Sequence, residues 1–204
     1  MNTGRNMKLL FFQWHSFMNK GIERGLKELE IPYDTFFYQF NDWEKDDAFL
    51  EQFRAYLKAG AYTDVLSVNF SPLISMLCEE LGILYTAWVY DSPLHIRNLE
   101  SLKNSCNRIF FFDRGQAEEH RKDGVNAMHL PLAVDTEVFR INASKREKED
   151  YRTDISLVGK LYQTEYAYFT APLQGYTKGY LEGIVNAQGK VYGGYLIPEL
   201  ITDE

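Results

Sequence analysis

The feature that most constrains the fold is the alternation of short apolar runs with segments whose apolar residues recur every three or four positions. Six such runs occur, at residues 8–14, 34–40, 64–69, 84–90, 108–112 and 127–132. The runs predict strands, and the stripes between them, such as Leu73, Leu77 and Leu81, predict helices. Continuously apolar strands that alternate with helices indicate a covered parallel sheet. The sequence therefore predicts an α/β fold, a doubly wound parallel sheet with helices on both faces.

Composition and charge exclude several classes of protein. A chain of 204 residues with 45% hydrophobic side chains can bury one good core and part of a second. The net charge of −7 argues against a nucleic-acid partner, which requires clustered Lys and Arg. The apolar run at residues 9–12 is too short for a membrane span or a secretion signal, and Cys78 and Cys106 lack disulfide or metal-ligand spacing. We therefore expect no membrane span, no metal site and a cytoplasmic location.

A charged segment divides the chain into two parts. Residues 145–150 read Lys-Arg-Glu-Lys-Glu-Asp, which is typical of a solvated linker. We expect a first domain at residues 1–142, a linker at 143–153 and the beginning of a second, incomplete α/β domain at 154–204. Residues 173–188 predict a helix with Gly175, Gly179 and Gly183 on one stripe. Each glycine costs about 1 kcal/mol relative to alanine, so either another backbone packs closely on the stripe or the helix is loose.

The most informative turn follows the fourth apolar run. Residues 84–93 read Leu-Tyr-Thr-Ala-Trp-Val-Tyr-Asp-Ser-Pro. Ser92 and Pro93 suit the N-cap and the first position of a helix, which leaves the carboxylate of Asp91 uncommitted. A similar Ser-Pro turn follows the third run, but Phe70 stands there in the place of the acid. Asp91 is therefore the first candidate for chemistry.

The ends of the strands supply the other candidates. A doubly wound order places the first and fourth strands side by side, and ligands bind outside the carboxyl ends of the strands where the sheet reverses its direction of growth. On this order His15 and Asp91 face one crevice, where both are candidates for catalysis. Helix N-termini also point into the crevice, which favours an anionic or polyhydroxyl ligand. The candidates for ligand binding are Trp14, Ser16, Asn69, Tyr90, Ser92 and Asp113.

Each candidate also has a purely structural alternative. His15 could hydrogen-bond its own loop, and Asp91 could be a second cap or an ion-pair partner. Asp113, with a glutamine three residues later, fits a capping box. Trp14 could pack in the core, and Asn69 could close the turn before the next helix. The residues alone leave these alternatives open.

Several catalytic motifs do not occur in the sequence. It has no Gly-x-Gly-x-x-Gly after the first strand, no Walker loop, no Gly-x-Ser-x-Gly elbow and no His-Glu-x-x-His. The four histidines are scattered along the chain. A bound cofactor is therefore not expected.

Two segments resemble a known family. Residues 130–139 read Leu-Pro-Leu-Ala-Val-Asp-Thr-Glu-Val-Phe, and residues 154–161 read Asp-Ile-Ser-Leu-Val-Gly-Lys-Leu. Together they resemble the junction between the two Rossmann-like domains of GT-B glycosyltransferases, although Ala133 replaces the usual glycine. The Trp-x-x-Asp-Ser-Pro turn at 88–93, the strand end at 110–113 and the tail at 178–184 are similar to the spore-maturation (CgeB-like) branch of that fold. The resemblance covers nearly the whole chain.

The resemblance implies a hexosyltransferase-like enzyme that moves a sugar from a nucleotide-activated donor to a hydroxyl of a small-molecule or glycan acceptor, without a structural need for metal. The first domain would hold the acceptor, and Asp91 or His15 would take the proton from its hydroxyl. Gly159 and Lys160 match the motif that approaches the donor phosphates, where a cation would offset the charge of the leaving group. A complete transferase of this family continues well beyond residue 204. The resemblance therefore implies a fragment that binds acceptor weakly and transfers nothing alone.

Two other classes of function remain as alternatives. The first is a stand-alone, non-catalytic binding or regulatory module that kept the fold, and a stop codon after residue 204 would favour it over the transferase. The second is an unrelated hydrolase of Rossmann-like topology, which turnover by the 204-residue chain alone would favour.

Overall fold

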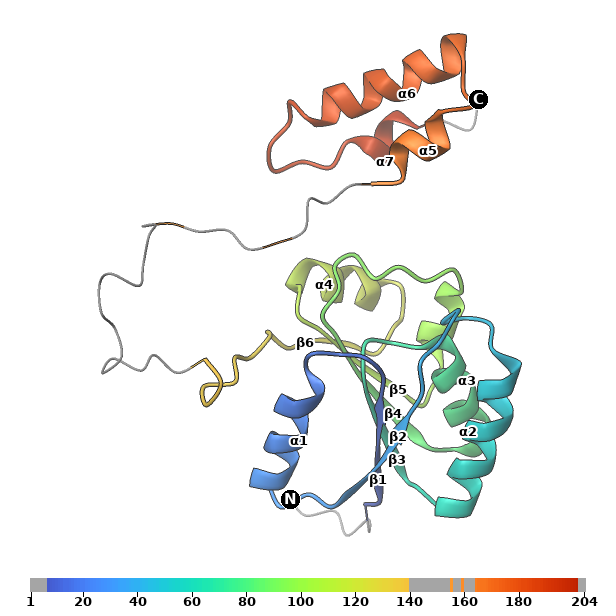
Figure 1. The fold of residues 1–204 in the computed structure, drawn as a ribbon, viewed down its shortest axis with the longest axis vertical. Coiled ribbons are helices and arrows are strands. Elements are labelled where there is room, and N and C mark those ends of the chain that lie inside the picture. The colour runs from blue at the N-terminus through green and yellow to red at the C-terminus, as the bar shows by residue number, and fades with distance from the viewer. Residues whose placement is uncertain (1–6, 140–154, 156–158, 160–163, 202–204) are drawn as a thin grey trace. The chain divides into compact units, whose positions relative to one another are not determined.

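The computed structural model describes residues 7–139, 155, 159 and 164–201 (Figure 1). Contacts within the chain define two compact units, Met1–Ile141 and Asn142–Glu204. Each unit is described by itself. The expected linker at 143–153 and most of the strand expected at 154–162 lie outside the described residues.

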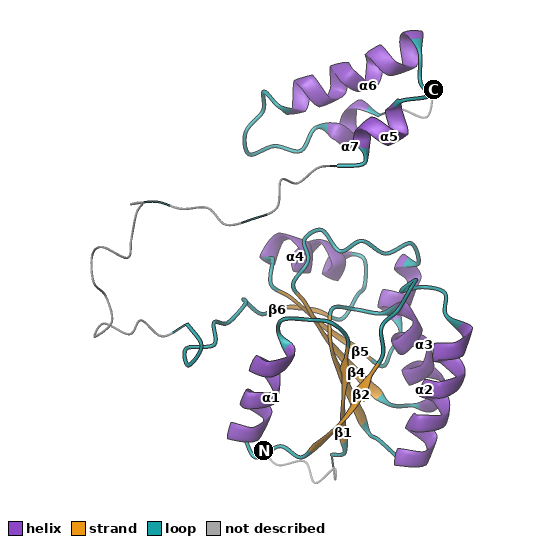
Figure 2. Cartoon of the chain, viewed as in Figure 1, coloured by secondary structure: helices purple, strands orange, loops and turns teal. Residues whose placement is uncertain are grey.

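The first unit is built on a six-stranded sheet in which every strand pair is parallel. The strands are β1 Leu9–Gln13, β2 Tyr33–Phe37, β3 Asp64–Val68, β4 Leu84–Val89, β5 Asn107–Phe111 and β6 Ala127–His129. Their order is β2-β1-β3-β4-β5-β6, and helices flank the sheet (Figure 2). The predicted α/β fold with a Rossmann-like parallel sheet is confirmed.

The order of the strands differs from the one expected. β1 pairs with β2 and β3, whereas β4 pairs with β3 and β5, so the first and fourth strands are not neighbours. The sheet reverses its direction of growth between β1 and β3. The crevice that such a reversal creates therefore lies at the ends of β1 and β3, with β4 one strand further along.

Helices lie on both faces of the sheet. α1 Asn19–Glu28 lies on one face, and α2 Asp47–Gly60 and α3 Pro72–Leu81 lie on the other (Figure 1). The fourth helix, α4 Arg114–Lys122, packs against β5 and β6. Its His120 ring stacks on Phe111 of β5 with the centroids 5.0 Å apart.

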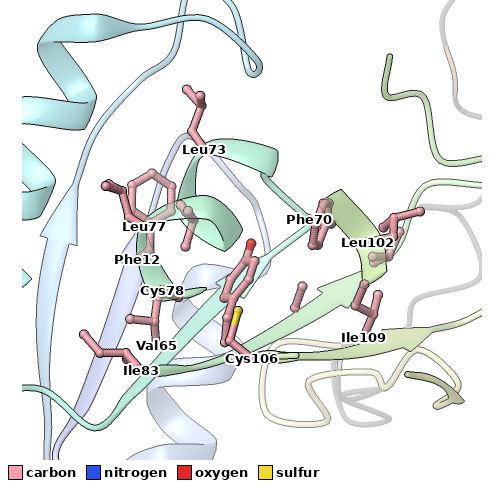
Figure 3. Packing of buried hydrophobic residues seen from close by; sticks show 14 of the residues in the cluster. Phe12, Val65, Phe70, Leu73, Leu77, Cys78, Ile83, Leu102, Cys106 and Ile109 are labelled. Atoms are coloured by element: carbon pink, nitrogen blue, oxygen red, sulfur yellow. The ribbon is translucent and has the colours of Figure 1, made fainter. Parts of the chain in front are cut away.

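The core lies between the sheet and helices α2 and α3. Figure 3 shows Phe12, Leu77, Cys78 and Ile109 among its side chains. The ring of Phe12 lies 5.8 Å from the ring of Phe49 on α2, centroid to centroid, and both side chains are fully buried. Burial alternates along β4 and β5, because successive side chains point to opposite faces, whereas the first four residues of β1 are all buried.

The segment after β4 is a loop, so the helix expected there is wrong. Ser92 and Pro93 are exposed and joined by a cis peptide bond, and no helix begins at them. The next helix is the short 3-10 helix η1, Leu99–Lys103. Asn98 caps η1, since its side chain accepts a hydrogen bond from the backbone N–H of Ser101 at 3.3 Å.

Acidic side chains from the segment between β2 and α2 hold this loop. The carboxylate of Glu44 accepts hydrogen bonds from the backbone N–H groups of Arg97 and Asn98, at 2.6 and 2.8 Å. The guanidinium of Arg97 also pairs with Asp42 at 2.6 Å. These bonds replace the intrahelical bonds that the expected helix would have supplied.

The described part of the second unit consists of three helices, α5 Tyr166–Thr170, α6 Gly175–Gln188 and α7 Ile197–Leu200. The helix predicted at 173–188 is confirmed as α6. A Cβ atom added at Gly179 or Gly183 would meet nothing within 4 Å, so no described segment packs closely on the glycine stripe. None of the helices in the described ranges is long and apolar enough to cross a membrane.

Candidate functional site

Asn69 joins the ends of two adjacent strands. It follows β3 directly in a left-handed conformation, with φ at 59°, which asparagine adopts more readily than most residues. Its side-chain Oδ1 accepts a hydrogen bond from the backbone N–H of Tyr90 at 3.1 Å, and its Nδ2 donates to Asp91 Oδ2 at 2.7 Å. Its backbone N–H donates to the carbonyl oxygen of Trp88 at 2.9 Å. Asn69 thus holds the end of β4, and with it the carboxylate of Asp91.

The hydrogen bond from Asn69 leaves half of the Asp91 carboxylate available. Asp91 is exposed, and its Oδ1 makes no hydrogen bond with the residues that the structure describes. An oxygen of this kind can accept a proton or a hydrogen bond from a ligand hydroxyl. The arrangement presents a fixed, accessible acceptor at the carboxyl end of the sheet.

Four rings form an aromatic wall beside Asp91: Trp14, Phe17, Trp43 and Tyr90. The rings of Trp14 and Tyr90 are nearly parallel, with centroids 6.5 Å apart, and Phe17 lies 5.2 Å from Tyr90. Trp43 meets Trp14 edge-on at 5.0 Å. Burial raises the pKa of Tyr90, and the negative charge of Asp91 raises it further. The phenol of Tyr90 therefore stays neutral.

Trp14 packs against the core, as the structural alternative predicts. Its indole N–H donates to the carbonyl oxygen of Val68 at 2.9 Å, which fixes the ring across the end of β3. The side chain is partly buried and packs against the core. The same ring contributes to the aromatic wall, so core packing and a place beside a ligand are compatible here.

A groove continues from the aromatic wall. It has a volume of about 730 Å³ and lies between α1 and residues 133–139, with Trp88 also in its lining. Phe17 belongs both to the groove and to the aromatic wall. Arg24 of α1 pairs with Asp135 at 2.5 Å within the lining, which also contains the charged side chains of Lys20 and Glu28, so the groove combines charged with apolar side chains.

His15 lies at the carboxyl end of β1, and its ring contact and backbone hydrogen bond are with β2 and the segment that follows β2. Its ring packs against Phe37 of β2, 5.0 Å between centroids, and its backbone N–H donates to Gln39 Oε1 at 3.2 Å. Within the described ranges, no hydrogen bond or ring contact joins His15 to Asp91. The structure therefore brings Trp14, Asn69, Tyr90 and Asp91 together and leaves His15 on the β2 side.

The remaining candidates are spread over other positions. Ser16 stays in its own loop, where its hydroxyl accepts a hydrogen bond from the backbone N–H of Met18 at 3.2 Å. Ser92 is exposed next to Asp91. Gly159 is exposed in the second unit, and Lys160 lies outside the described residues.

Asp113 is a helix cap, as the capping-box alternative predicts. Its Oδ1 accepts a hydrogen bond from the backbone N–H of Gln116 at 2.8 Å, at the start of α4. The reciprocal half of the capping box is not formed, because Gln116 Oε1 is buried without a partner among the described residues. One carboxylate oxygen of Asp113 is therefore already used by the backbone.

Sequence reasoning missed Phe17, Trp43 and Glu44. Phe17 is 80% exposed, and the sequence signal for it is a phenylalanine in the loop that directly follows the first apolar run. Trp43 stands between acidic residues in a segment without periodicity, where nothing marks it as part of a site. In the described part of the chain no cluster of three or more His, Cys, Asp or Glu side chains could hold a metal ion.

Two comparisons with known proteins found no relative of this chain. A scan against protein-family models found no family that matches the chain, and a search of the curated proteins found no match either.

Proposed function

We propose that the first unit is the acceptor-binding domain of a GT-B glycosyltransferase, which transfers a sugar from a nucleotide-activated donor to an acceptor hydroxyl. The observation that carries the proposal is the fixed carboxylate of Asp91 beside the aromatic wall. It stands close to the point where a parallel sheet reverses, which is where such sheets bind ligands. The resemblance of residues 130–139 and 154–161 to the interdomain junction of that family supports the same conclusion.

The chemistry of the site suits a sugar. A sugar ring offers apolar C–H faces and a rim of hydroxyls, and it therefore matches a surface that combines aromatic rings with a few hydrogen-bonding groups. The rings of Trp14 and Tyr90 supply the first element, and Asp91 supplies the second. The adjoining groove of about 730 Å³ gives room for the rest of an acceptor.

In the proposed reaction Asp91 is the base. Its free Oδ1 takes the proton of the acceptor hydroxyl while the hydroxyl oxygen bonds to the anomeric carbon of the donor. The bond from that carbon to the phosphate oxygen breaks, and the nucleotide leaves with the electron pair. The nucleotide sugar is a substrate, and Gly159 and Lys160 are the residues that the family resemblance assigns to its phosphates. His15 is the second choice for the base, since its ring faces β2.

Ligand-observed NMR with a panel of methyl glycosides tests acceptor binding by the full chain. We expect saturation transfer from the protein to at least one glycoside, with the affinity lowered about tenfold or more in Asp91→Asn. Asp113→Asn is the matched control, because it alters a carboxylate at the end of another strand that serves as a helix cap. Absence of transfer to every glycoside, or equal binding by Asp91→Asn, would overturn the proposal and leave the non-catalytic module as the better reading.

Turnover gives the second measurement. In a protein that also contains a donor-binding domain, Asp91→Asn is expected to lower turnover by about two orders of magnitude, the usual contribution of a general base. Unchanged turnover together with reduced stability would assign Asp91 a structural role.

A further inference from the structure

A chain of buried hydroxyls lies directly beneath Asn69. Tyr85 on β4 is fully buried, and its Oη lies 2.7 Å from Ser67 Oγ and accepts a hydrogen bond from the backbone N–H of Ser71 at 3.0 Å. Ser67 Oγ donates in turn to the carbonyl oxygen of Asn69 at 2.6 Å. The three residues around Tyr85 thus belong to one turn, the turn that carries Asn69.

The direction of each hydrogen bond follows from counting hydrogens. A serine hydroxyl has one hydrogen, and Ser67 uses it on the carbonyl oxygen of Asn69. Tyr85 therefore donates to Ser67 Oγ at 2.7 Å, which is closer than its other acceptor, the carbonyl oxygen of Asn69 at 3.5 Å. Burial raises the pKa of Tyr85, so the phenol keeps its hydrogen. Hydrogen bonds that run in one direction through a dry interior strengthen one another.

Packing alone does not explain this hydroxyl. Tyr85 points into the apolar core, with its ring 5.7 Å from that of Phe70, where a phenylalanine would have nearly the same shape. A buried hydroxyl costs free energy unless its hydrogen bonds are made, and here they are all made to the turn at residues 67–71. Ser71 is also the N-cap of α3. The phenol therefore fixes the turn between β3 and α3 from below.

The turn at residues 67–71 links the Tyr85 hydroxyl to Asp91 through Ser67 and Asn69. Asn69 makes its bonds to Asp91 and Tyr90 from a left-handed backbone conformation, and the bond from Ser67 holds the carbonyl oxygen of Asn69. We infer that the Tyr85 hydroxyl is a positioning group, which acts through Ser67 and Asn69 to set the orientation of the Asp91 carboxylate. The coupling stands on the hydrogen bonds alone, whereas its meaning for catalysis rests on the proposed function.

The test uses Tyr85→Phe, which removes one oxygen atom, in the full chain labelled with ¹⁵N. We expect hydrogen exchange of the Tyr90 backbone amide to accelerate about tenfold, and the side-chain amide resonances of Asn69 to move toward their positions in unfolded peptides. Tyr62→Phe is the matched control, since Tyr62 is also buried and its hydroxyl bonds to Asp34 at 2.8 Å, on another part of the core. The control removes the same atom from another tyrosine and should leave both signals of the site unchanged.

Two outcomes would overturn the inference. One is unchanged exchange at Tyr90 in Tyr85→Phe, and the other is an equal change in Tyr62→Phe, which would indicate general loosening of the fold. Should Tyr85→Phe fail to fold, Ser67→Ala removes the next link and carries the same expectation. Binding of the methyl glycosides separates this inference from the proposed function. If Tyr85→Phe changes the signals of Asn69 and Tyr90 but the protein binds no glycoside, the coupling holds and only the transferase proposal is refuted.

Discussion

The buried amide of Asn107 offers a sharp test of how the first unit is held together. Asn107 begins β5 and is fully buried. Its Nδ2 donates to the carbonyl oxygens of Ser101 and Leu102 at 2.8 and 3.0 Å, and its Oδ1 accepts from Ser75 Oγ at 2.8 Å. One side chain therefore connects α3, η1 and β5.

Asn107→Ala removes these bonds without adding any steric conflict. The buried carbonyl oxygen of Leu102 loses its donor, which costs about 1–3 kcal/mol when the oxygen is left unsatisfied, whereas the carbonyl oxygen of Ser101 also accepts from the backbone N–H of Asn104 at 3.4 Å. The hydroxyl of Ser75 is less affected, because it also lies 3.2 Å from the carbonyl oxygen of Ser101 and can donate there. The expected loss in the free energy of unfolding is therefore about 1–3 kcal/mol, with a central value of about 2 kcal/mol.

Urea denaturation followed by circular dichroism measures this loss. The matched control is Asn126→Ala, because Asn126 is exposed and its Nδ2 makes a single bond, to the carbonyl oxygen of Asn107 at 2.9 Å. The control should cost about 1 kcal/mol or less. A loss below about 1 kcal/mol for Asn107→Ala, or equal losses for both variants, would refute the argument that the carbonyl oxygen of Leu102 depends on this amide.

Two further predictions concern stability. Hydrogen bonds from the backbone N–H of Cys106 and the hydroxyl of Ser105 lower the pKa of Glu79. The contribution of Glu79 to the stability of the fold is therefore fully present above the usual glutamate pKa of about 4.3, and it is lost as the pH falls through the lowered pKa. The stability difference between the protein and Glu79→Gln, measured by urea denaturation, should therefore shrink as pH is lowered from 7 to 3, and a constant difference would contradict the assignment. Ala61 ends α2 with φ at 50° and ψ at 45°, a conformation that costs a non-glycine residue about 1–2 kcal/mol. Ala61→Gly should raise the free energy of unfolding by about 0.5–1 kcal/mol after the extra entropy of an unfolded glycine is subtracted, and an unchanged or lower value would count against this reasoning.

The sequence predicted the strands well but could not predict their order. An apolar run of four to seven residues between helical stripes reports burial on both faces, which every inner strand of a parallel sheet shares. Burial says nothing about which strand is the neighbour. The position of β1 between β2 and β3 is therefore known only from the structure. It places the crevice at the ends of β1 and β3, and not between β1 and β4, where the sequence analysis placed His15 opposite Asp91.

The two Ser-Pro turns show how the same local signal leads to different structures. Ser71 caps α3 as its residue type predicts, because the apolar residues that follow, such as Ile74 and Leu77, are fully buried against the sheet. Ser92 begins no helix, because the residues after it are mostly exposed or half-buried, and Glu44 binds their backbone instead. A cap can begin a helix only where the helix has a face to bury.

Individual side chains at the site were predictable to different degrees. Asn69 and Trp14 directly follow strands and Asp91 comes two residues after β4, so their place at one edge of the sheet could be inferred from the chain alone. The side to which His15 turns depends on the ring of Phe37, a contact across strands that no local pattern contains. The same holds for Trp43, which reaches Trp14 from a separate segment.

The placement of the tryptophans has an optical consequence. The sequence contains three of them, Trp14, Trp43 and Trp88, and all three stand in the aromatic wall or in the groove. Ultraviolet emission excited at the red edge of the indole band therefore arises entirely from this region. The wavelength and intensity of this emission therefore report on the surface where we place the acceptor, and they report little on the interior of the protein.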